Sequence, residues 1–236
     1  MEGALLLGCR ARFRDGFFAR ARDAGPLFST GVGTTVAEAA LIPVQVVPAL
    51  ICGCGLPFAY AIGRRSVGRG PVDAIDAAGL AAALIVGAWA FRSYGAAVAI
   101  VAMAASACAI SDVRFGYIFD AVLAAAGTTI AISGAIDGEG ARIVPASIAC
   151  FAVVAILSAT FRGSIGAGDV KYSAILGGLG IASGLESIAL AFACGGAVAA
   201  ILMVAGKARR DSSLPFAPFL AVGVLASLTI GRTWGL

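Results

Sequence analysis

Three aspartates lie within or at the edges of long apolar stretches of the sequence: Asp112, Asp120 and Asp169. A carboxylate inside a membrane-spanning segment costs about 2.5–3.5 kcal/mol or more, so each acid is a candidate functional residue. The chain contains no histidine, which excludes histidine-activated serine or cysteine nucleophiles and histidine-bound zinc or haem. Any catalysis must therefore depend on carboxylates, lysine, tyrosine, cysteine or backbone groups.

Asp112 and Asp169 are predicted to lie at the same membrane face. Asp112 ends one apolar stretch, Asp169 begins another, and two predicted spans separate them. Two carboxylates that lie close together cannot both ionise cheaply, so repulsion and desolvation keep one protonated. The ionised carboxylate can take a proton from water while the protonated one donates to a carbonyl oxygen. This is general acid–base hydrolysis of a peptide bond, with apparent pKa values that belong to the pair.

A glycine-rich loop precedes Asp169, with Gly163, Gly166 and Gly168 close together. Such a loop can adopt positive φ and allow another backbone to approach closely. Asp169 would then open a helix, with its carboxylate in the positive field of the helix N-terminus. A simpler interpretation is a glycine turn followed by an aspartate N-cap, but the pairing with Asp112 favours the catalytic one.

The composition indicates which elements must position these acids. Of the 236 residues, 60% are hydrophobic and 13% are charged, whereas a soluble domain is about 45–50% apolar and about 25% charged. A soluble globule and a disordered chain are both excluded, so an integral membrane protein is predicted. We expect residues 36–236 to form an all-α bundle of about eight transmembrane helices, with six or seven as the alternative, over residues 39–63, 77–91, 93–111, 115–136, 143–161, 172–185, 187–206 and 212–231.

Loop charges predict the orientation of this bundle. The loops on the side of Asp112 and Asp169 carry nine lysines and arginines, and those on the other side carry three. Positively charged loops favour the cytoplasmic side, so both acids are predicted near the cytoplasmic face. Residues 1–35 would lie on the other side with five more arginines, and we give the short internal loops more weight.

Residues 1–35 differ from the rest of the chain because arginines alternate there with phenylalanines. This pattern predicts a basic interfacial segment on the membrane surface or an N-terminal tail, and no nucleic-acid partner is expected. The six cysteines are scattered, and Cys52 and Cys54 lack the second pair that a tetrahedral zinc site would need. No metal site is predicted.

Three motifs in order resemble those of the type IV prepilin peptidases, a family of membrane aspartic proteases. The sequence GAGDVK at 166–171 is similar to the family's Gly-x-Gly-Asp-x-Lys motif, and the segment from Asp112 to Asp120 resembles its first aspartate motif. The sequence LPFAPFLAVG at 214–223 is similar to the start of a family helix. The resemblance covers roughly residues 40–231.

The resemblance implies a multi-pass enzyme of the bacterial cytoplasmic (inner) membrane. It would remove the basic leader from prepilins or pseudopilins at the cytoplasmic face of the lipid bilayer. Asp112 and Asp169 would be the catalytic pair, Gly166 and Gly168 would shape the loop, and Lys171 would be the motif lysine. The oligomeric state is left open.

The sequence also departs from the family pattern. Phe119 and Ala217 replace the usual proline and glycine, and the loop at 64–76 lacks the cysteines that bind zinc in longer members. The chain therefore resembles the compact form of the family, and we expect no metal and no cofactor. S-adenosylmethionine would be needed only if the N-methylation that some longer members perform is retained.

Several alternatives stay open at this point. Asp120 is a polar residue at the cytoplasmic edge or a partner of the aspartate pair, and Arg114 is an orientation determinant or attracts acidic substrate groups. The protein could instead be an ion-coupled transporter whose acids bind a cation, although we find no inverted repeats with broken helices. It could also be a non-catalytic membrane assembly factor, whose acids pair with Arg114 and Lys171.

Overall fold

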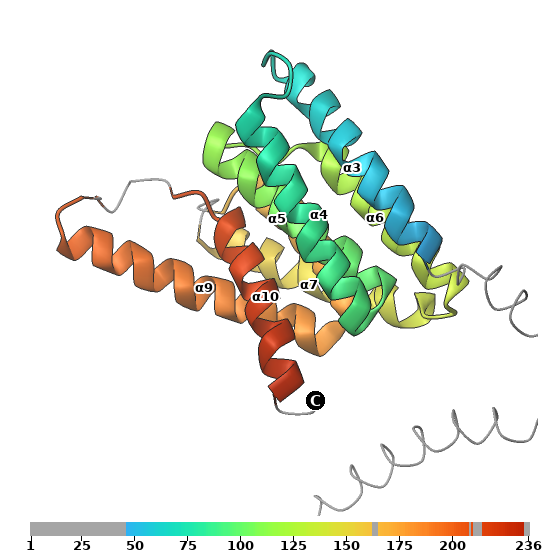
Figure 1. The fold of residues 1–236 in the computed structure, drawn as a ribbon. Helices are drawn as coiled ribbons and strands as arrows, with labels where there is room; N and C mark the ends of the chain where they lie inside the picture. Colours follow the sequence, from blue (N-terminus) through green and yellow to red (C-terminus); the bar gives the residue numbers. More distant parts are fainter. Residues whose placement is uncertain (1–45, 162–164, 208, 210–213, 234–236) are drawn as a thin grey trace, which may run out of the picture. The chain divides into compact units, whose positions relative to one another are not determined.

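The computed structural model describes residues 46–161, 165–207, 209 and 214–233, and every regular element within them is helical. The N-terminal segment predicted at 1–35 lies outside these residues. The elements, shown in Figure 1, are α3 (Val46–Ser66), α4 (Ala74–Tyr94), α5 (Ala96–Phe115), α6 (Asp120–Ile136), α7 (Gly140–Thr160), α8 (Ala167–Ile175), the 3-10 helix η1 (Leu176–Leu179), α9 (Ile181–Val204) and α10 (Ala217–Thr233).

Five of the described helices are long and apolar enough to cross a membrane: α3, α4, α5, α7 and α9. Each has between 20 and 24 residues, which suits the roughly 20 residues that a span needs. Helices α6 and α10 are apolar but shorter. The all-helical, multi-pass architecture is therefore as predicted, while the expected count of about eight spans is not established.

The span predicted at 172–185 is not one helix. The chain there divides into α8, η1 and the start of α9, and Gly180 separates the last two with a φ of +86°. Gly177 lies so close to the backbone of Ser147 in α7 that a side chain at this position could not be accommodated. The glycine at 177 lets η1 pack tightly on α7. A hydropathy pattern does not detect this contact, because it shows only that the stretch is apolar.

Helix α4 (Ala74–Tyr94) is longer than the span predicted at 77–91. It begins at Ala74, because the Asp73 side chain accepts hydrogen bonds from the Ile75 and Asp76 amides and so caps the helix. The helix can include the buried Asp76 because this carboxylate forms ion pairs with arginines of α3 and α5.

Helix α5 is the centre of the bundle. About 61% of its apolar window is buried, against 22–33% for the other four candidate spans. It packs against α3, α4, α6 and α10, and α9 crosses α10 in contact with it (Figure 1). Many of its buried residues are alanines, which let neighbouring helices approach closely in lipid. The C-terminal end of this central helix carries Asp112.

Candidate active site

Asp112 and Asp169 line the same cavity, which has a volume of about 360 Å³. The cavity is formed where the C-terminal end of α5 and the α5–α6 connection meet the start of α8. Its lining residues are Asp112, Gly116, Tyr117, Ile118, Asp120, Gly166, Ala167, Gly168, Asp169 and Lys171. The structure therefore brings the two aspartates to one site, together with most of the other residues that the sequence motifs single out.

Asp112 is held by backbone amides of a helix that is distant in sequence. Its Oδ2 accepts a hydrogen bond of 3.0 Å from the Ala217 amide at the start of α10, and the Phe216 amide also donates to this carboxylate. These are free donors at a helix N-terminus, which carries partial positive charge. The flanking Pro215 and Pro218 have no N–H group, so the two amides between them are the ones directed to Asp112.

Asp169 has a drier and less satisfied environment. It is the third residue of α8, whose N-cap is Gly166, and the Gly166 amide donates to its carboxylate as in a capping box. The residue is only 9% exposed, and its Oδ1 has no hydrogen-bond partner among the described residues. Burial, reinforced by the negative charge of Asp112, raises the pKa of Asp169 from 3.8 to about 7.

The glycines before Asp169 serve a different purpose from the one predicted. Gly166 has a φ of −63°, and Gly168 is helical, so neither needs the left-handed region. A Cβ on Gly166 would lie 3.1 Å from Asp169 Oδ2, and a Cβ on Gly168 would lie 3.2 Å from Ile118 Cβ. The expectation of positive φ is therefore wrong for both: Gly166 leaves room beside the Asp169 carboxylate, and Gly168 leaves room for Ile118. Gly163 lies outside the described residues.

Lys171 and Asp120, which both line the cavity, form an ion pair. The Nζ atom lies 2.9 and 3.1 Å from the two carboxylate oxygens, and the pair links α8 to α6. Both side chains are more than half exposed, and such surface pairs contribute about 0–1 kcal/mol to stability. Asp120 is thus a direct partner of the motif lysine.

Arg114 belongs to a second charge cluster, which is partly buried and does not line the cavity. It pairs with Asp73 and Asp76 of the α4 start, and Arg64 of α3 pairs with the same two acids. Tyr60 also donates to Asp76 at 3.1 Å. The hydrogen bond from Arg114 holds the pKa of Asp73 below its ordinary value. This cluster ties three helices together within one turn of Asp112.

Two buried residues beside the acids were not singled out from the sequence. Cys108 lies one turn before Asp112 on α5, and Tyr172 lies one turn after Asp169 on α8; both are fully buried. The Tyr172 hydroxyl has no hydrogen-bond partner within the described part of the chain, and burial raises its pKa well above 10. Their helical spacing from the aspartates was the available signal.

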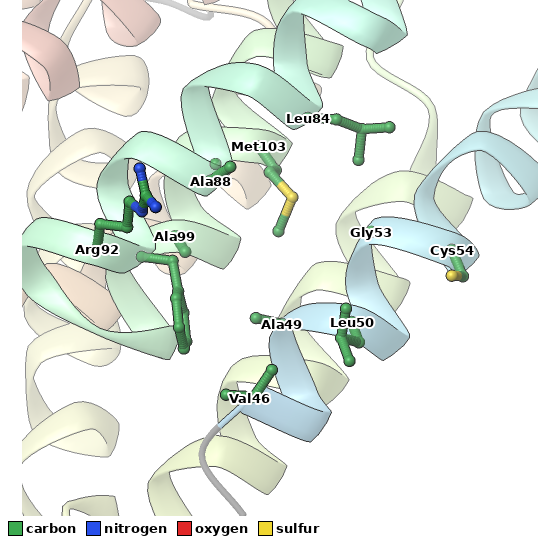
Figure 2. Close-up of a pocket in the computed structure, with 12 residues that line it drawn as sticks. Val46, Ala49, Leu50, Gly53, Cys54, Leu84, Ala88, Arg92, Ala99 and Met103 are labelled. Atoms are coloured by element: carbon green, nitrogen blue, oxygen red, sulfur yellow. The ribbon is translucent and has the colours of Figure 1, made fainter. Parts of the chain in front are cut away.

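A separate cavity of about 460 Å³ lies between α3, α4 and α5 (Figure 2). It is lined by apolar residues and Arg92, and no carboxylate lies along its wall. Met103 and Ala99 of α5 line it, and they lie about 14–20 Å along the helix from Asp112 at 1.5 Å per residue. Its volume exceeds that of the aspartate cavity, but it offers no acid–base groups.

The described residues contain no group of three or more histidine, cysteine, aspartate or glutamate side chains that could hold a metal ion. Comparison of the chain with protein-family models, with curated proteins and with solved structures found no match. The chemistry of the site must therefore be argued from its own geometry and from the sequence motifs.

Proposed function

We propose that this protein is a membrane aspartic endopeptidase that removes the leader peptide from type IV prepilin-like proteins at the cytoplasmic face of a bacterial inner membrane. The observation that supports this most directly is that two aspartates line one cavity in unequal environments. One accepts two helix-terminal amides, and the other is buried with an unpartnered oxygen. The three sequence motifs supply the substrate class.

The unequal environments suggest a role for each acid. Asp169, with its pKa of about 7, is still protonated in a large share of the molecules at neutral pH, and this form donates to the oxygen of the scissile carbonyl. Asp112, supported by the Ala217 and Phe216 amides, is the carboxylate that takes a proton from the attacking water. The carbon–nitrogen bond of the resulting tetrahedral intermediate then breaks: Asp112 gives the proton it took from water to the leaving amine, and a hydroxyl of the intermediate returns a proton to Asp169, which restores both acids.

The ion pairs argue against a purely structural role for these acids. An assembly factor whose acids merely neutralise nearby cations would pair Asp112 with Arg114 and Asp169 with Lys171. Among the described residues, Arg114 instead pairs with Asp73 and Asp76, and Lys171 pairs with Asp120. The two cations nearest in sequence are thus engaged elsewhere, which leaves both carboxylates available for water and substrate.

The test is co-expression with a candidate prepilin, followed by the loss of the leader on a gel. Asp112→Asn and Asp169→Asn should each abolish cleavage while the protein still inserts into the membrane. Asp137→Asn is the matched control, because this carboxylate lies at the far end of α6, where it accepts from Ser133. Undiminished cleavage by both aspartate variants would refute the proposal, and so would a wild-type protein that leaves every tested prepilin intact.

A further inference from the structure

A second apolar groove, of about 400 Å³, runs between α6, α7 and α8. Its walls include Gly127 and Ala131 of α6 and Val144 and Ile148 of α7. Ala131, Val144 and Ile148 are exposed. Because α6 and α7 are apolar, these side chains would face lipid in a membrane. The groove is therefore a lipid-side feature, which an apolar occupant can enter without leaving the bilayer.

The groove is open along α6. A Cβ built on Gly127 meets nothing within 4 Å, while one on Gly134 would lie 2.8 Å from Ile143 Cδ1. Helices α6 and α7 thus close on each other near their connecting turn and separate toward the other end. The stretch of α6 from Leu123 to Gly134, which lines the groove, is about 16 Å long at 1.5 Å per residue.

Helix α8 connects this groove to the aspartate cavity. Lys171 lines both spaces, while Asp169, two residues earlier, lines only the cavity, and Ala174 and Ile175, one turn later, line only the groove. A chain lying in the groove therefore meets the Lys171–Asp120 pair at the groove's end and the two catalytic candidates directly beyond it. The 460 Å³ cavity between α3, α4 and α5, called the α3–α4 cavity below, has no such connection, since it shares no lining residue with the aspartate cavity.

We infer that the α6–α7 groove is the docking site for the apolar transmembrane helix of the protein substrate. This inference rests on the proposed function, because it requires a peptide bond to be delivered to the two aspartates. A lipid acyl chain could fill the same space, but it has no peptide bond to present. A substrate helix with its N-terminal end at Lys171 would place its leader in the polar cavity and its apolar turns against Ala131, Val144 and Ile148.

The first test fills the groove by the substitution Gly127→Leu. Leucine has space there and is a better helix former than glycine, so the variant should fold. We expect cleavage of a full-length, membrane-embedded prepilin to fall about tenfold or more, which corresponds to about 1.4 kcal/mol of lost docking energy. Gly196→Leu on α9, where a Cβ also meets nothing within 4 Å, and Gly53→Leu in the α3–α4 cavity are the matched controls.

The second test does not depend on turnover. Ala131→Cys should form a disulfide with a cysteine placed in the first turns of the prepilin's apolar helix, whereas Ala200→Cys on the exposed face of α9 should not. The unsubstituted protein supplies the background from its native cysteines.

Equal cleavage by Gly127→Leu and Gly196→Leu, or cross-linking at Ala200 as strong as at Ala131, would overturn the docking inference. The inference would also be overturned if Gly127→Leu lost a co-purified lipid, detected by mass spectrometry, but cleaved the prepilin as well as the wild type does. A failure of the proposed function is seen separately, as cleavage that persists in the aspartate variants.

Discussion

The protonation of Asp169 gives a prediction that can be measured without any substrate. The pKa of this carboxyl is 3.8 in an ordinary setting and about 7 in the folded protein, chiefly because it is buried. Between these values the folded state holds a proton that the unfolded state has lost, so the free energy of unfolding falls as pH rises. The contribution is fully present below about pH 4 and is lost as pH passes through 7.

The size of the effect follows from the same values. Each pKa unit corresponds to about 1.4 kcal/mol, so a difference of about three units gives up to about 4 kcal/mol. Asp169→Asn removes the titrating group and should remove this pH dependence. The difference in unfolding free energy between wild type and variant should therefore change by up to about 4 kcal/mol between pH 4 and pH 8, with the variant favoured at the higher pH.

Reversible unfolding of the purified protein by a denaturing detergent, followed at several pH values, measures this difference. Asp137→Asn, which removes an exposed carboxylate, is measured beside the wild type and Asp169→Asn as the control for the loss of one negative charge. Parallel curves for wild type and Asp169→Asn would show that folding does not raise the pKa of Asp169, and the assignment of Asp169 as the acid would then be wrong.

Two further predictions concern the scaffold around the site, and thermal unfolding in detergent measures both. Asp76→Asn should destabilise the protein by about 3–5 kcal/mol, because the buried Arg64 would lose its buried ionised partner and keep only the more exposed Asp73 at 3.6 Å; an unchanged melting temperature would contradict this. Gly223→Ala should cost about 1–3 kcal/mol, because the added Cβ would overlap the Ser187 carbonyl where α9 and α10 cross. Gly196→Ala has open space and should be neutral or slightly stabilising, so equal effects of the two alanines would refute the close crossing.

The membrane-spanning architecture could be predicted from the sequence because burial in lipid requires long uncharged stretches. The stretch predicted at 143–161 corresponds closely to α7 (Gly140–Thr160). The prediction was wrong at 172–185, where the close contact between Gly177 and Ser147 breaks the run into shorter elements. That contact joins separate helices, and hydropathy along one segment carries no information about it.

The candidate site was predicted in part for a related reason. Because an even number of predicted spans separates Asp112 from Asp169, the sequence was enough to place them at the same end of the bundle. In the structure both line one cavity. The amides that hold Asp112 come from residues about a hundred positions away, so no local pattern could assign them. The pairing of Lys171 with Asp120 is also a product of packing between α6 and α8.

The contact between Asp112 and the start of α10 has a consequence for biosynthesis. The two partners are 105 residues apart in the chain, and ribosomes add about 5–20 residues per second. About 5–20 s therefore pass between the synthesis of Asp112 and the synthesis of the α10 amides that bind it. If the proposed function holds, the growing polypeptide is inert during its own membrane insertion and becomes a protease only when α10 takes its place.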